Sequence, residues 1–148
     1  MEQSPEDFAV RYDWCAGSMP PPYHYEYTIR IGPGPVGEVV FSPDYPGQDA
    51  PVWTEGFDVN EAALDALYHL VADRVLGREF AKVEDGPVGG SLAWMSGTVG
   101  GEPFRVPTQI EEPERVEPVY AAIKELVPRD LWDSLLARRE QYERDYEG

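Results

Sequence analysis

Apolar and polar residues alternate most strictly between residues 23 and 31. One side of the alternation carries Tyr23, Tyr25, Tyr27, Ile29 and Ile31. The other side carries His24, Glu26, Thr28 and Arg30. A period of two is typical of a strand with one buried face. The pattern therefore predicts a strand over residues 23–31 whose tyrosines face into the protein.

Four further strands follow from the same pattern and from turn residues. A loop of glycine and proline over residues 32–37 leads into a predicted strand at residues 38–42, and a third strand covers residues 52–59. Residues 91–99 and 102–107 form two more strands, because the Gly100-Gly101 pair between them suits a tight hairpin. These strands make an antiparallel arrangement the simplest one.

Three helices are predicted. Asn60 is a suitable N-cap for the first, whose apolar residues recur at helical spacing until Gly77 ends it. The second begins near Pro118 and ends before Pro128, and the third covers residues 129–146. The predicted order is βββ-α-ββ-α-α. It indicates an α+β fold with a single antiparallel sheet and helices packed on one face, over residues 11–148 as one domain. Residues 1–10 are predicted to be a disordered acidic tail.

The charge of the chain restricts its partners. Its 148 residues hold 28 acidic and 12 basic side chains, for a net charge of −16 and a pI near 4.3. This balance argues against nucleic acid, and against docking on an anionic membrane. No apolar run approaches the length of a membrane-spanning helix, and the acidic N-terminus has no signal-peptide core, so a cytoplasmic location is expected.

No catalytic residue, metal site or cofactor is indicated. The one cysteine, Cys15, excludes an intramolecular disulfide, and its spacing from His24 does not indicate a nucleophile with its base. Asp65, His69 and Asp73 fall four residues apart. They form either a metal or acid–base row, or a solvated helix face with side-chain pairs.

The aromatic side chains of the first third are the strongest candidates for binding. The candidate binding residues are Tyr23, His24, Tyr25, Glu26, Tyr27, Tyr45, Trp53 and Glu55. In one interpretation the tyrosines lie under the helices as core. In the other they form a wall of a pocket or a protein-contact patch, where Tyr and Trp are enriched.

Several short segments share one likeness: Gly17–Pro22 followed by Tyr23–Tyr27, then Pro43–Pro46, Pro51–Glu55 and Val88–Ser91. They resemble segments of a family of uncharacterised small acidic bacterial hypothetical proteins. The resemblance covers about residues 11–146. It implies a single α+β domain and transfers no catalytic residue.

Two functions remain open at this point. The first is a non-catalytic protein-binding domain, of the inhibitor or immunity type, that uses an acidic and aromatic surface toward a basic protein. The alternative is a small-molecule binding module or enzyme with a Tyr/Trp-lined pocket between sheet and helices. An enclosed pocket with converging Tyr hydroxyls, His24 and Glu55 would favour the second.

Overall fold

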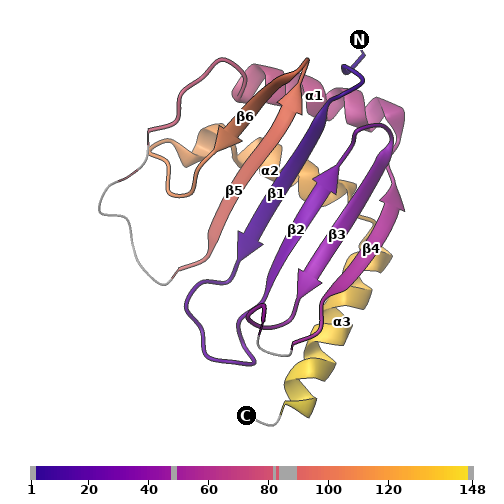
Figure 1. Ribbon diagram of the computed structural model, residues 1–148, viewed down its shortest axis with the longest axis vertical. Helices are drawn as coiled ribbons and strands as arrows, with labels where there is room; N and C mark the ends of the chain where they lie inside the picture. The colour runs from indigo at the N-terminus through magenta and orange to yellow at the C-terminus, as the bar shows by residue number, and fades with distance from the viewer. Residues whose placement is uncertain (1–2, 48–49, 82, 84–89, 147–148) are drawn as a thin grey trace.

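The computed structural model describes residues 3–47, 50–81, 83 and 90–146. They contain one antiparallel sheet of six strands in the order β4-β3-β2-β1-β5-β6 (Figure 1). The strands are β1 (Ala9–Cys15), β2 (Glu26–Ile31), β3 (Val36–Ser42), β4 (Trp53–Asp58), β5 (Leu92–Val99) and β6 (Glu102–Val106). The observed order is therefore ββββ-α-ββ-α-α, with one strand more than predicted.

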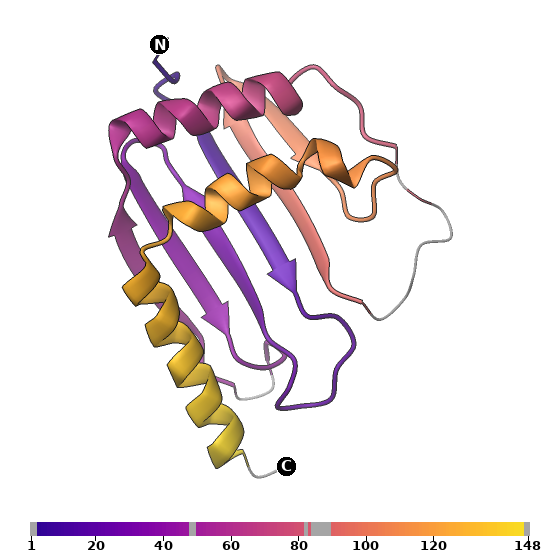
Figure 2. The same cartoon turned by 180° about the vertical axis from the view of Figure 1, so that it is seen from behind.

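The helices lie on one face of the sheet. They are α1 (Glu61–Arg74), α2 (Glu117–Leu126) and α3 (Arg129–Asp145), with a single 3₁₀ turn at Pro113–Arg115 before α2. Figure 2 shows α1 and α2 crossing the strands and α3 lying along the β3–β4 edge, while Figure 1 shows the opposite face open. The predicted α+β class, with helices on one face of a single antiparallel sheet, is confirmed.

The N-terminal boundary is the main correction to the predicted fold. Residues 8–10 are not a tail, because Phe8 is 1% exposed and β1 begins at Ala9. β1 lies at the centre of the sheet, antiparallel to both β2 and β5. Its own alternation, with Val10 and Tyr12 buried and Arg11 exposed between them, carries the strand signal.

Local chemistry explains two of the correctly predicted ends. Asn60 caps α1, because its side-chain oxygen accepts the backbone N–H groups of Ala62 and Ala63. The β5–β6 hairpin turns at Gly100-Gly101, where both residues have positive φ. The Asp7 carboxylate accepts the N–H groups of both glycines, and these bonds lower the pKa of Asp7.

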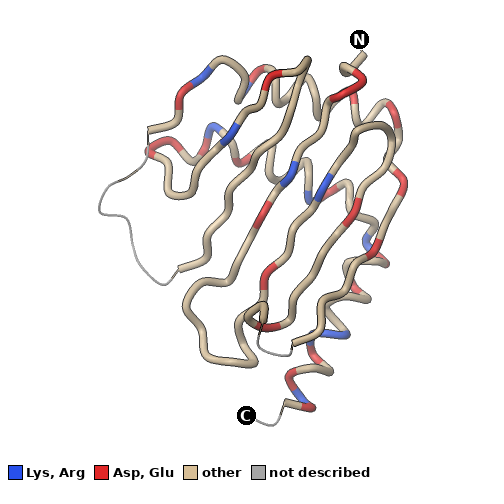
Figure 3. The backbone as a smooth tube through the Cα atoms, in the orientation of Figure 1, with Lys and Arg blue, Asp and Glu red and all other residues tan. Residues whose placement is uncertain are grey.

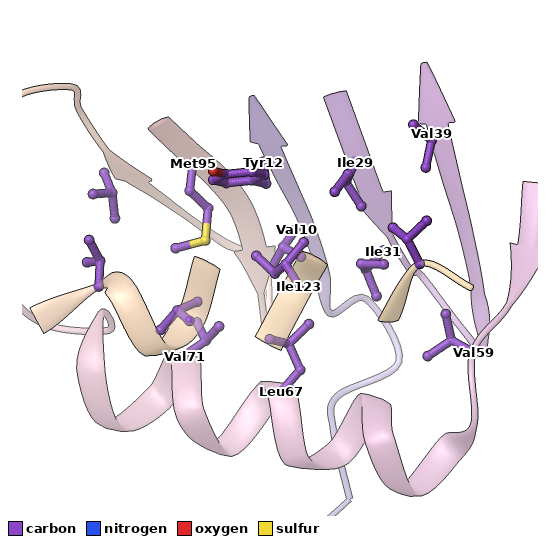
Figure 4. Packing of buried hydrophobic residues seen from close by; sticks show 14 of the residues in the cluster. Val10, Tyr12, Ile29, Ile31, Val39, Val59, Leu67, Val71, Met95 and Ile123 are labelled. Carbon is purple, nitrogen blue, oxygen red and sulfur yellow. The ribbon is translucent and has the colours of Figure 1, made fainter. Parts of the chain in front are cut away.

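The core fills the space between the sheet and the helices (Figure 4). Ile29, Ile31 and Val39 of the sheet are fully buried against α1 and α2, which contribute Val71 and Ile123. Complete burial on this scale is the main favourable term in folding. Among the described helices, none has the length and apolarity needed to cross a bilayer.

Candidate functional site

An aromatic row crosses the helix-facing side of four strands. The register places Trp14 opposite Tyr27, Tyr27 opposite Phe41, and Phe41 opposite Trp53. Their ring centroids are 5.2, 6.2 and 5.9 Å apart in that order. Neighbours opposite each other on one sheet face stabilise the sheet through such contacts. The aromatic row is thus a product of strand register.

The middle of the aromatic row is core. Trp132 of α3 meets Tyr27 edge-on, with ring centroids 4.8 Å apart, and also contacts Phe41. Tyr27 is 8% exposed and Phe41 is fully buried. For these rings the core interpretation is correct, because they are buried between the sheet and α3.

Two arginines of α3 lie over aromatic rings that neighbour this buried core: Arg138 over Trp53 and Arg139 over Tyr25. The Arg139 guanidinium lies 4.0 Å from the Tyr25 ring centroid, a cation–π contact, and donates to the Tyr23 carbonyl oxygen at 3.3 Å. Arg138 donates to Glu55 Oε1 at 3.0 Å. Tyr25 and Glu55 therefore hold α3 against the sheet, and neither converges with His24 on an enclosed pocket.

His24 has a structural position. It is 3% exposed, stacks on Tyr45 with ring centroids 3.8 Å apart, and contacts the Gly17 carbonyl oxygen through Nδ1 at 2.7 Å. Its Nε2 lies 2.9 Å from Glu26 Oε2. A carbonyl oxygen and a carboxylate oxygen are acceptors, so both ring nitrogens of His24 are engaged by groups of the protein itself.

The loop between β3 and β4 is tied to the end of α3. Asp44 is 2% exposed and accepts the Tyr45 N–H at 2.8 Å and the Tyr142 hydroxyl at 2.7 Å. Burial, followed by the hydrogen bond to Asp44, raises the pKa of Tyr142 to about 12. The Tyr45 hydroxyl donates to the Met19 carbonyl oxygen at 2.6 Å. Three segments distant in sequence are therefore joined at this end of the molecule.

The same end carries exposed apolar side chains. Met19, Tyr23, Val52 and Tyr146 are 41%, 52%, 55% and 36% exposed, and they make up four of the six large apolar side chains that are exposed in the described residues. They belong to the β1–β2 loop, the segment before β4 and the end of α3, which lie together at the lower end in Figure 1. We call these four residues the tyrosine end.

The predicted site residues divide between these places. Tyr27 is core, while Tyr25, Trp53 and Glu55 contact α3. Glu26 and Tyr45 each contact the buried His24, which belongs to the same β1–β2 loop as Met19 and Tyr23 of the tyrosine end. Of the eight, Tyr23 alone is classed as exposed, at 52%, because β2 begins at Glu26 and not at residue 23. Sequence reasoning missed Met19, Val52, Tyr142 and Tyr146.

The remaining sequence candidates are Cys15 and the row of Asp65, His69 and Asp73. Cys15 pairs with Glu26 across β1 and β2, and Glu26 contacts His24, so the three are nearer than their spacing suggested. The Asp65 carboxylate accepts the Ser4 N–H at 2.9 Å, and this bond lowers the pKa of Asp65. In the described part of the chain, no three His, Cys, Asp or Glu side chains are arranged to hold a metal ion.

A hollow of about 380 Å³ lies beside the start of α2, away from the predicted residues. Ala93, Ile110, Val116 and Tyr120 are among the side chains that line it. It is apolar, and it includes none of the eight candidate binding residues. Of those eight residues, Glu26 and Tyr27 line a smaller hollow of about 190 Å³ beside Thr28 and Trp94.

Comparison of the sequence with protein-family models and with curated proteins finds no match. The resemblance to small acidic bacterial proteins stays a prediction.

We expect the protein to unfold in alkali because three neighbouring tyrosines are buried. Burial raises the pKa of Tyr12 from 10.0 to about 12, and burial also raises the pKa values of Tyr27 and Tyr120. The folded state then holds these protons more tightly than the unfolded state. Stability is fully present below pH 10 and falls as the pH rises from about 10 to about 12.

Tyrosinate absorbance and far-UV circular dichroism, followed together against pH, check this expectation. The absorbance of the buried tyrosines should appear only with the loss of ellipticity. Ionisation of all nine tyrosines without any change in ellipticity would contradict the burial of this cluster.

Proposed function

We propose that this chain is a non-catalytic protein-binding domain, of the inhibitor type, and that its tyrosine end binds a basic protein. The observation that supports this is the gathering of Met19, Tyr23, Val52 and Tyr146, each at least 36% exposed, at one end of the molecule. Exposed apolar residues that gather in one patch mark interaction sites more often than scattered ones do. Tyrosine in particular is enriched among the residues that dominate binding energy.

The tyrosine end is organised before any partner arrives. Tyr45 holds Met19 by two hydrogen bonds, Arg139 holds the Tyr23 carbonyl oxygen, and Tyr142 contacts Tyr146 with ring centroids 5.9 Å apart. A patch whose backbone is fixed loses less conformational freedom on binding than a flexible one.

Charge favours a basic partner. The described residues of the three segments that form this end, 16–26, 43–47 with 50–52, and 137–146, hold five carboxylates and three arginines. The net charge of the whole chain is −16. Such a field raises the association rate with a positively charged surface and weakens as salt is added. The proposal places the protein in the cytoplasm, since a chain with one cysteine uses no internal disulfide.

The experiment compares capture by wild type, Tyr23→Lys and Val36→Lys from a cell lysate at low and high salt. Val36 is a matched control, because it is 51% exposed and stands at the start of β3, at the opposite end of the sheet. We expect a basic protein to be held by wild type and by Val36→Lys, and to be reduced about tenfold by Tyr23→Lys.

Added salt should also weaken capture of that protein, whereas both variants should keep the unfolding temperature of wild type. Equal capture by the three proteins would refute binding through the tyrosine end. Capture that does not respond to salt would refute the electrostatic part of the proposal.

A further inference from the structure

The open face of the sheet carries a row of arginines. The register places Arg30 opposite Arg11, Arg11 opposite Ser96, and Ser96 opposite Arg105. Figure 3 shows the three arginines as blue segments on β2, β1 and β6. Like charges directly opposite each other destabilise a sheet. The pairing is unexpected here, because the first 74 residues hold only three basic side chains and two of them are Arg11 and Arg30.

Arg11 is held in place by a buried carboxylate. Its Nε and Nη2 donate to Asp13 at 3.0 and 3.1 Å, and the Thr28 hydroxyl donates to the same carboxylate at 2.6 Å. Asp13 is 6% exposed although it lies on the open face. One side of the guanidinium is thereby fixed, while its Nη1 has no bond to the described residues and the side chain is 50% exposed. Arg11 is oriented toward solvent with donors to spare.

Arg105 completes the arrangement on the far side of Ser96. It is exposed, and no carboxylate of the described residues lies within ion-pair distance of it. Two strand spacings separate β1 from β6, so the Cα atoms of Arg11 and Arg105 are about 10 Å apart. Ser96 stands between the two arginines in the register and has a short side chain, so a group above it would lie between Arg11, whose Nη1 is unused, and Arg105.

An aromatic ring stands next to this space. Trp94 is two residues before Ser96 on β5, so both side chains are on the open face. Trp94 is opposite Asp13, and it lines a hollow of about 190 Å³ together with Thr28, Val40 and the carboxylate residues Asp13 and Glu26. A flat apolar surface and a pair of arginines are therefore adjacent on a face that no helix covers.

We propose that this face binds a phosphomonoester that carries a flat ring, with the phosphate above Ser96 between Arg11 and Arg105 and the ring against Trp94. Guanidinium groups match phosphate oxygens in charge and geometry, and a hydroxyl adds a further donor. An aromatic side chain provides a stacking surface for a flat ring. This site is separate from the tyrosine end and does not depend on the protein-binding function.

The test uses adenosine monophosphate, adenosine and inorganic phosphate as probes, in low salt because the net negative charge opposes anion binding. Binding is followed by calorimetry and by amide and indole NMR signals. We expect adenosine monophosphate to shift the signals of Ser96 and Trp94, and to bind more tightly than either of its parts. Arg105→Gln should weaken this binding about tenfold, whereas Arg129→Gln, an exposed arginine on the helix side, should leave it unchanged.

Trp94→Leu separates the two halves of the proposal. It should lower the affinity for adenosine monophosphate to that for inorganic phosphate and leave phosphate binding intact. Because Arg105 is exposed, all variants except Trp94→Leu should unfold at the wild-type temperature; Arg105→Lys, which keeps the charge, should bind with intermediate affinity.

Unchanged spectra with both phosphate probes would overturn the site, as would equal affinity in wild type and Arg105→Gln. An adenosine monophosphate affinity no higher than that of phosphate would overturn the ring subsite. None of these results bears on capture by the tyrosine end.

Discussion

Replacing Phe41 by alanine is expected to lower the free energy of unfolding by about 3–5 kcal/mol. Phe41 is fully buried at the centre of the aromatic row, where its ring lies between 5.7 and 6.3 Å from the rings of Tyr25, Tyr27, Trp53 and Trp132. The four surrounding rings cannot easily move into the space that the Phe41 ring leaves. The free-energy cost of the resulting cavity therefore adds to the cost of the lost apolar burial.

Chemical denaturation of wild type, Phe41→Ala and Tyr23→Ala measures this effect. Tyr23 is 52% exposed, so its truncation should change stability by no more than about 0.5 kcal/mol. A loss below about 1 kcal/mol in Phe41→Ala would show that the aromatic row is loosely packed. Tyr25, by contrast, is only partly buried, and its ring faces Arg139.

The second large effect is expected at Gly97, where alanine should destabilise the protein by about 1–3 kcal/mol. A Cβ built at Gly97 would collide with the backbone carbonyl oxygen of Ala9 and with the Phe104 ring. The ring can rotate, but the carbonyl belongs to β1 at the centre of the sheet. An alanine at Gly97 would therefore push the backbone of β1 away from β5 and weaken the hydrogen bonds between the two strands.

Gly56→Ala is the matched control, since Gly56 is also a strand glycine. The nearest atom to a Cβ at Gly56 is the Gly37 carbonyl oxygen at 3.8 Å, an ordinary contact. Alanine at this position should be neutral or slightly stabilising, because it restricts the unfolded chain. Equal thermal unfolding temperatures for Gly97→Ala and Gly56→Ala would contradict the close approach of β1 to β5.

The helices and hairpins were predictable because their signals are local. Asn60 caps α1 with its own side chain, and Gly100-Gly101 adopts positive φ within the turn it forms. Each of these effects acts over a few neighbouring residues, so it can be predicted from the local sequence. The α+β class follows from the order of such elements.

The position of β1 in the sheet could not be predicted from the sequence alone. The alternation of Val10, Tyr12 and Trp14 was visible, but the acidic residues before it resemble a frayed end. Its place at the centre of the sheet comes from pairing with β5, which lies more than 75 residues away. A strand flanked on both sides is buried by its partners, and its own sequence carries no mark of them.

The sequence by itself determined the acidic charge, which depends on composition alone. It also determined the Asn60 cap of α1, the turns and the inward face of β2, because short-range sterics and hydrogen bonds decide them. Only the tertiary structure decided which residues share a surface. Strand register aligned Trp14, Tyr27, Phe41 and Trp53 in one row and Arg30, Arg11 and Arg105 in another. The docking of α3 brought Tyr142 to Asp44. Such contacts join residues up to about a hundred positions apart, and their energies depend on the whole packed core, which no local pattern encodes.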